Sequence, residues 1–199
     1  MLEPQNCNFM FCLPLTIEQF YSDLMNLSKD FVRELLSSYK EDGVNYNWSN
    51  YFSNVIKPYQ KLKKQFERYG FVFHESVTLE NFKNIINNFH VNILFSHCKH
   101  DKNEAIEFFD RLVYKDEFVD SIPRTYNKVI DLSVCNPEQT ALELKDKRRL
   151  AIVKSSNISI KINYWLYFYG ILFDIINKRK VKFYSNALEL AISQFNQKK

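Results

Sequence analysis

The sequence predicts an α/β fold in which a mostly parallel sheet is flanked by helices. Residues 91–96 and 129–134 are short apolar runs rich in β-branched side chains, which is typical of buried strands. A strand pattern at 71–77, a helical face from Leu79 to Phe89 and the strand at 91–96 also form a β-α-β unit. Such a unit implies parallel strands joined by a right-handed crossover.

The first 70 residues add a strand and two helices. Residues 8–13 are expected to form a short strand. A helix is expected over 16–39, because Thr16 can cap it and apolar residues then recur at helical spacing. A second helical pattern covers 48–69, where Pro58 should kink or split the helix. The two helices could form a helical hairpin that serves as a sheet-flanking layer or as a docking surface.

The chain is therefore divided into an N-terminal strand and helical segment, residues 1–70, and a core, residues 71–199. In the core, a hairpin is expected at 106–114, turning at Asp110 and Arg111. The remaining elements expected after it are a helix at 117–122, a strand at 128–134, a helix at 138–147, a strand at 150–153 and helices at 162–177 and 184–195.

Composition predicts a protein of the cytoplasm. The 199 residues are 46% hydrophobic and 25% charged, as in ordinary globular proteins. The four cysteines lack the spacing of a disulfide framework, and the apolar segment at 162–176 is shorter than the roughly 20 residues that a membrane helix needs. Because that apolar segment is short, no membrane contact is expected. No Gly-rich phosphate-binding loop is visible, and no cofactor is expected.

The charges are distributed unevenly. Residues 145–199 carry 12 basic and 3 acidic groups, whereas residues 71–144 carry 7 basic and 12 acidic groups. A basic tail can bind nucleic acid. Because these charges are spread over separate elements and no nucleic-acid motif accompanies them, solvated helix faces are the favoured interpretation. Retention on DNA or RNA that depends on salt would indicate otherwise.

Two reactive side chains, His97 and Cys135, end two of the expected strands. Sites in parallel sheets form at the carboxyl ends of strands, so the two residues could meet as a Cys/His nucleophile pair. Asn136 can cap the following helix, with Pro137 as its first residue, and a helix N-terminus favours thiolate. Each residue by itself could equally be an ordinary core side chain.

The cluster from His97 to His100 offers ligand types that zinc prefers. Structural zinc sites usually combine two separated ligand pairs, and no second pair is present in the sequence. We therefore expect no metal.

A strand ending in Ser96-His97 followed by a strand ending in Ser133-Val134-Cys135 resembles the caspase-like cysteine peptidases, and most of all their CHAT branch. The resemblance covers about residues 71–195. The further segments that resemble the family are 106–110, 150–153, 165–169 and 184–191. One departure is Cys98, which stands where the family usually has glycine.

The resemblance implies a caspase-like three-layer domain and a cytoplasmic cysteine endopeptidase that cleaves a protein substrate with His97 and Cys135. It implies that the backbone N–H groups of Cys98 and Cys135 bind the oxyanion. Strand alternation places Asp131 and Ser133 on the same face as Cys135, where the family shapes its substrate pocket. The acidic excess of residues 71–144 favours cleavage after a basic or neutral residue.

The family also implies activation by a protein partner, in microbial defence or regulated cell death. The alternative is a catalytically silent caspase-like binding module that docks a partner through the helices of residues 16–69. Cys98 in place of glycine favours this alternative, whereas the presence of both His97 and Cys135 favours the enzyme.

Overall fold

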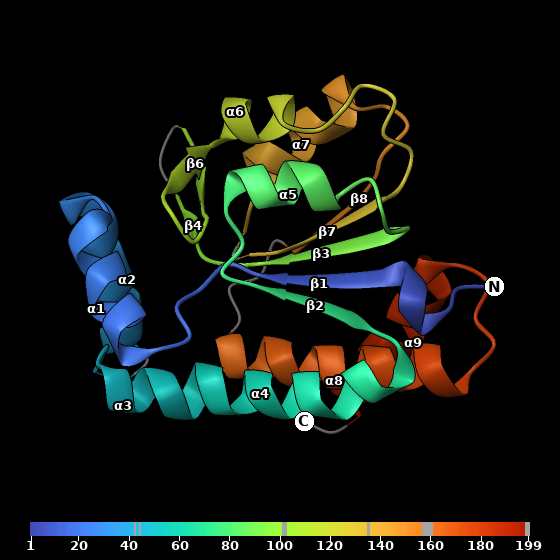
Figure 1. Ribbon diagram of the computed structural model, residues 1–199, viewed down its shortest axis with the longest axis horizontal. Coiled ribbons are helices and arrows are strands. Elements are labelled where there is room, and N and C mark those ends of the chain that lie inside the picture. Colours follow the sequence, from blue (N-terminus) through green and yellow to red (C-terminus); the bar gives the residue numbers. More distant parts are fainter. Residues whose placement is uncertain (42, 44, 101–102, 135, 157–160, 198–199) are drawn as a thin grey trace.

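The computed structural model describes residues 1–41, 43, 45–100, 103–134, 136–156 and 161–197. Within them the main sheet has five strands in the order β2-β1-β3-β7-β8, and all neighbouring pairs are parallel (Figure 1). The strands are β1 (Cys7–Phe11), β2 (Val72–Glu75), β3 (Val91–Phe95), β7 (Val129–Ser133) and β8 (Ile152–Ser155). The predicted mostly parallel sheet is confirmed.

Helices cover both faces of the sheet, which gives three layers (Figure 1). One face carries α5 (Leu79–Ile85), α6 (Lys115–Asp120) and α7 (Glu138–Lys147), and the other carries α4 (Lys57–Phe66), α8 (Ile162–Lys178) and α9 (Tyr184–Asn196). Side chains alternate along each strand, so each face has a separate apolar core. The expected buried helix at 162–177 is confirmed as α8. In the parts of the chain that the structure describes, no helix has the length and apolar character needed to cross a membrane.

Strand β1 is an interior strand of the sheet. It pairs with β2 on one side and with β3 on the other, and all five of its residues are buried. The strands at 71–77 and 91–96 are therefore parallel, as predicted, but β1 lies between them. The chain runs outward from β1 to β2 on one side and then through β3, β7 and β8 on the other. The order of strands reverses between β1 and β3, which is where open parallel sheets usually form their sites.

The helix expected over 16–39 consists of two helices, α1 (Ile17–Asn26) and α2 (Lys29–Glu41), so the single-helix prediction is wrong. Leu27 is extended, with φ −69° and ψ 151°. The hydroxyl of Ser28 accepts the N–H of Phe31 at 3.2 Å, because a serine side chain can replace the backbone partner and begin a new helix. The capping box of Thr16 and Gln19 is confirmed.

The second helical pattern of the N-terminal segment remains helical across Pro58. Helix α3 (Trp48–Tyr51) continues through a π-helical segment (Phe52–Ile56) into α4, and the segment ends at Gly70 with φ 96°. The N–H of Lys57 bonds to the carbonyl of Phe52 in the wider π turn. Pro58 follows in the first turn of α4, where a missing N–H does not split the helix. Helix α4 packs against α8 and so belongs to the layer below the sheet.

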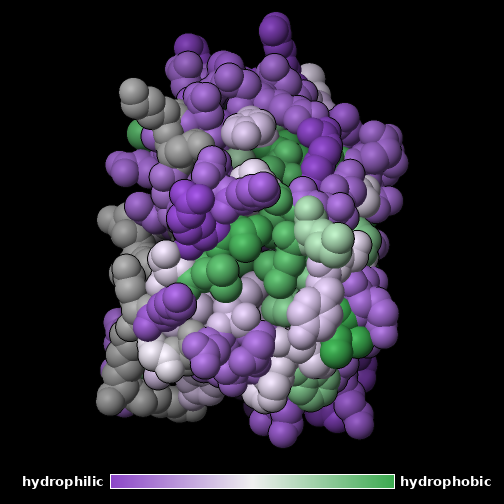
Figure 2. Space-filling view, turned by 90° about the vertical axis from the view of Figure 1, so that its left-hand side faces the viewer, coloured by the Kyte–Doolittle hydropathy of each residue, from purple (hydrophilic) through white to green (hydrophobic). Residues whose placement is uncertain are grey.

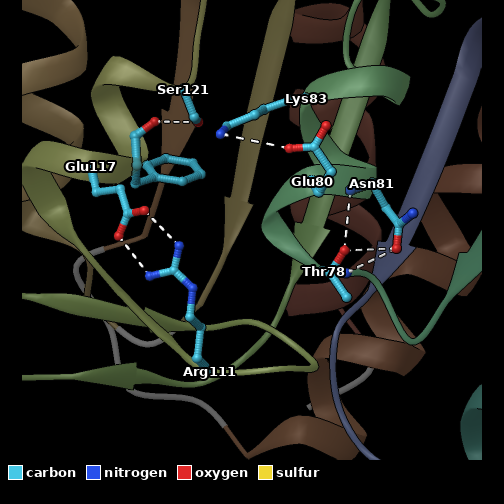
Figure 3. Close-up of polar contacts among 8 residues, drawn as sticks. Thr78, Glu80, Asn81, Lys83, Arg111, Glu117 and Ser121 are labelled. Atoms are coloured by element: carbon cyan, nitrogen blue, oxygen red, sulfur yellow. Dashed lines mark hydrogen bonds and ion pairs between the residues drawn. The ribbon is translucent and has the colours of Figure 1, made fainter.

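A small antiparallel sheet stands beside the end of β3. It consists of β4 (Cys98–Lys99), β5 (Ala105–Glu107) and β6 (Leu112–Tyr114), so the hairpin predicted at 106–114 is confirmed, whereas β4 was not expected. Arg111 lies in the turn between β5 and β6 and pairs with Glu117 of α6 through two contacts of 2.8 and 2.5 Å (Figure 3). Figure 3 also shows the N-cap of α5, in which Thr78 accepts the N–H of Asn81 at 3.1 Å.

Helices α1 and α2 lie at the end of the molecule next to this small sheet (Figure 1). The carboxylate of Glu34, in α2, accepts the backbone N–H of His100, just after β4, at 3.1 Å. Phe20, in α1, is 1% exposed and packs on Tyr46 and Tyr51, with ring centroids 5.1 and 4.9 Å apart. These contacts attach α2 to the small sheet and α1 to the segment around α3.

Candidate active site at the carboxyl edge of the sheet

The strands that precede His97 and Cys135 end side by side. In the register of β3 and β7, Phe95 is paired with Ser133, and the N–H of Ser96 donates to the carbonyl of Ser133 at 3.3 Å. Each of the two candidate residues follows its strand by two positions. Cys135 itself lies outside the described residues, so the contact between the two side chains stays a prediction.

His97 is held by Glu107, a residue of β5. The two side chains are 7% and 2% exposed, and His97 Nδ1 lies 2.8 Å from Glu107 Oε2. Their backbones are joined as well, since the Glu107 N–H donates to the His97 carbonyl at 3.0 Å. The Ser96 hydroxyl also donates to the Glu107 carbonyl. An acceptor at Nδ1 fixes both the orientation of the ring and the nitrogen that carries the proton.

The surroundings of His97 favour its neutral form. Burial lowers the pKa of His97 to about 4 and raises the pKa of Glu107 to about 7. The contact with Glu107 is therefore one in which Nδ1–H of a neutral imidazole donates whenever Glu107 is ionised. His97 Nε2 is buried and has no hydrogen-bond partner among the described residues. This nitrogen carries the lone pair that a general base needs.

A second carboxyl group reaches the pair from α1. Asp23, in α1, interacts with Glu107, and this interaction is one of the causes that shift the pKa of each carboxyl group. Burial, together with the charge of Glu107, raises the pKa of Asp23 to about 9. Sequence reasoning named neither carboxyl group as part of the site. The predicted hairpin at 106–114 was a signal for Glu107, because a strand that returns beside His97 can place a side chain against the imidazole ring. No local sequence pattern pointed to Asp23.

Cys98 turns its side chain away from His97. The thiol side chain is 6% exposed and belongs to the core on the α5–α7 face of the sheet. Cys98 also does not need the backbone freedom of glycine: among the described non-glycine residues, only Ser76 and Asn136 have a positive φ. Because His97 and Glu107 are a hydrogen-bonded pair in the small sheet, the N–H of Cys98 points away from β5.

The side chains predicted to shape a substrate pocket, Asp131 and Ser133, lie on the α8–α9 face of β7 and are 0% and 2% exposed. Asp131 pairs with Lys154 of β8 at 2.8 Å and accepts the hydroxyl of Tyr184 of α9 at 2.5 Å. Lys154 also stands 4.6 Å from the ring centroid of Trp165. These contacts give Asp131 a structural role in joining β7, β8 and α9, rather than an open position in a pocket.

Helix α7 is capped differently from the prediction. It begins at Glu138, and Pro137 precedes it without a side-chain cap. Asn136 has φ +44°, in the left-handed region, and therefore lacks the extended conformation that an N-cap requires. The cap comes from Glu104, whose carboxylate accepts the N–H of Gln139 at 3.1 Å, the N–H of Thr140 at 2.9 Å and the hydroxyl of Thr140 at 3.0 Å. This negative charge offsets the positive end of the helix near Cys135 in the sequence.

Replacing Glu104 by Ala is expected to lower the free energy of unfolding by roughly 1–3 kcal/mol, because three hydrogen bonds at a buried helix end lose their acceptor. Urea unfolding measures this. Glu138→Ala is the matched control, since Glu138 is exposed in the first turn of the same helix and should cost about 0.3–1 kcal/mol. Equal losses in the two variants would show that Glu104 does not act as the cap.

Comparisons with models of protein families and with curated proteins found no match to this chain. Within the described residues, no group of three or more His, Cys, Asp or Glu side chains is arranged to hold a metal ion.

Proposed function

We propose that the protein is a caspase-like cysteine endopeptidase in which Cys135 is the nucleophile and His97 the general base. The observation that carries this proposal is the state of His97. Its Nδ1 is held by a buried carboxylate, while its Nε2 is buried without a partner among the described residues. His97 Nε2 is one of several buried polar atoms without a partner among the described residues, each costing about 1–3 kcal/mol, and it is set apart by the carboxylate that holds the other ring nitrogen.

The fold supports the same function. The main sheet has a central reversal of strand order, and His97 follows the strand next to that reversal. Strand β7, which precedes Cys135 in the sequence, pairs with β3 on the side away from β1. Two reactive residues that follow adjacent parallel strands are well placed to act on one substrate. The small sheet beside them supplies Glu107, the third residue that a nucleophile and base of this type need.

In the proposed reaction, His97 Nε2 takes the proton of the Cys135 thiol, and the sulfur attacks the carbonyl carbon of a peptide bond. The tetrahedral intermediate collapses, the C–N bond breaks, and the imidazolium gives its proton to the leaving amine, which leaves a thioester. A water molecule, deprotonated by His97, then hydrolyses the thioester. The N–H groups of Cys98 and Cys135 bind the oxyanion, each contributing about 3 kcal/mol.

Alkylation tests the nucleophile. Cys135 is expected to react with iodoacetamide near pH 7.5 faster than Cys7 and Cys12, because the latter two are buried. Burial raises the pKa of Cys7 to about 12 and that of Cys12 well above its usual range, so little thiolate forms at either. Mass spectrometry of the folded protein ranks the sites. Labelling of Cys7 or Cys12 ahead of Cys135 would contradict the proposal.

A silent binding module is the second candidate, and the surface of α1 and α2 favours it. These helices expose Ile17, Met25 and Leu36, with Met25 at 85% exposure. Figure 2 shows apolar side chains gathered on the end of the molecule where the two helices lie. Exposed apolar patches commonly mark interaction sites. The same surface could bind the activating partner of a peptidase, so partner binding alone does not separate the two candidate functions. Substitution of Cys135 separates them, because only the peptidase needs its thiol.

A further inference from the structure

A cavity of about 750 Å³ opens at the amino edge of the main sheet, which is the edge opposite to His97. Three strands begin at its wall, and the first residues of these strands, Val91 of β3, Val129 of β7 and Ile152 of β8, line it. Leu2 and the first turn of α9 form further walls, on the side of the molecule where the N-terminus lies (Figure 1). Small-molecule sites in proteins have volumes of this size.

The walls of the cavity are joined by hydrogen bonds between distant segments. The N–H of Ile152 donates to the carbonyl of Lys128 at 3.0 Å, which fixes the start of β8 beside the start of β7. The N–H of Leu2 donates to the carbonyl of Val181, just before α9, also at 3.0 Å. Tyr184, the first residue of α9, is anchored to β7 through its hydroxyl group. The cavity is therefore a feature of the fold.

The charge of the cavity is positive. The lysines that line it are Lys128, Lys145, Lys154 and Lys182, and no described carboxylate lines it. Asp131 neutralises Lys154, at 2.8 Å. The ammonium group of Lys128 donates to a main-chain carbonyl, which carries no charge. Because no carboxylate pairs with Lys145 or Lys182 among the described residues, three positive charges at this cavity lack a counter-charge there.

One wall of the cavity is apolar and open to solvent. Phe183 is 56% exposed and Ile152 is 62% exposed, although both line the cavity. An exposed aromatic ring offers a face on which a nucleobase can stack. Phe183 is also the N-cap of α9, and it supplies no side-chain acceptor for the N–H groups of the first turn, where Ser185 lines the cavity. The N–H groups at the start of a helix favour an anion.

We propose that this cavity binds a nucleoside di- or triphosphate, whose phosphate groups contact the lysines and whose base stacks on Phe183. Three positive charges without a counter-charge match a ligand that carries at least two negative charges, and lysine is a common ligand of phosphate. The exposed ring beside them matches the base. The proposal is independent of the peptidase function, because the cavity and His97 lie at opposite edges of the sheet.

Isothermal titration calorimetry of the full chain with ATP and with GTP, in magnesium-free buffer at 0.15 M salt, tests the proposal. We expect saturable binding of one nucleotide per chain. Lys145→Ala and Lys182→Ala should each weaken it by about tenfold, because each removes a charged contact to phosphate. Phe183→Ala should weaken it by about fivefold or more, but should leave the binding of inorganic pyrophosphate within about twofold. All three side chains are exposed, so the variants are expected to fold.

Lys180→Ala is the matched control, because Lys180 is exposed two positions before Lys182 and does not line the cavity. Its affinity for nucleotide should stay within about twofold of the unchanged protein. Failure of both ATP and GTP to bind would overturn the proposal. Equal weakening in Lys180→Ala and Lys182→Ala would also overturn it, since the nucleotide would then be held by the diffuse charge of the basic tail. Unchanged nucleotide affinity in Phe183→Ala would show a site for anions alone and would overturn the assignment of a nucleoside phosphate.

Discussion

Replacing Cys135 by Ala is expected to lower the rate of substrate proteolysis by at least about 10,000-fold, because in the proposed reaction the thioester forms on the Cys135 sulfur. His97→Ala should cost a similar factor, since the remaining thiol has no base to take its proton. The two losses should not add in the double variant, because residues that act as a unit lose the same step. If the proposed peptidase function holds, single-turnover cleavage of a protein substrate measures all three rates.

The matched control for this experiment is His100→Ala. His100 is an exposed histidine three positions after His97, and its backbone N–H, which is kept in the variant, makes the contact to Glu34. Its rate should stay within about twofold of the unchanged protein, as expected for a surface position. Proteolysis that persists in Cys135→Ala would exclude Cys135 as the nucleophile. If the biological activity persists in Cys135→Ala although no proteolysis is detected, the binding module becomes the better account.

Replacing Lys154 by Ala is expected to lower the free energy of unfolding by about 3–5 kcal/mol, because it leaves the carboxylate of Asp131 buried without its charge partner. Asp131 is completely buried between β7 and α9, so water cannot replace the lost ammonium group. The double variant Asp131→Asn, Lys154→Met should lose much less, since both charges are removed and the Met side chain refills most of the space. Urea unfolding gives the three values.

Lys178→Ala provides the comparison for this ion pair. Lys178 also pairs with an aspartate, Asp174, at 2.8 Å, but both side chains are exposed on α8. An exposed pair contributes at most about 1 kcal/mol, so this variant should unfold close to the unchanged protein. If Lys154→Ala and Lys178→Ala lower the free energy of unfolding by similar amounts, water reaches Asp131. The predicted place of Asp131 in a substrate pocket would then be supported.

The sequence by itself determined the elements whose patterns are local. The apolar runs at 91–95 and 129–133 are short and rich in β-branched residues, which is typical of strands buried on both faces. The structure confirms both as buried strands. Helix α7 occupies the predicted residues 138–147, and the predicted cap at Thr16 is confirmed. These features depend on periodicity and on side chains three residues apart, which a sequence displays directly.

Only the tertiary structure decided the features that join distant segments. The insertion of β1 between β2 and β3, the capping of α7 by Glu104 and the ion pair of Asp131 with Lys154 each connect elements from different parts of the chain. The same holds for the contact of Glu107 with His97. Polar groups become buried only together with their partners, and the partner that a buried group finds is set by strand order and helix placement. Those follow from packing of the whole chain, so no local pattern could name them.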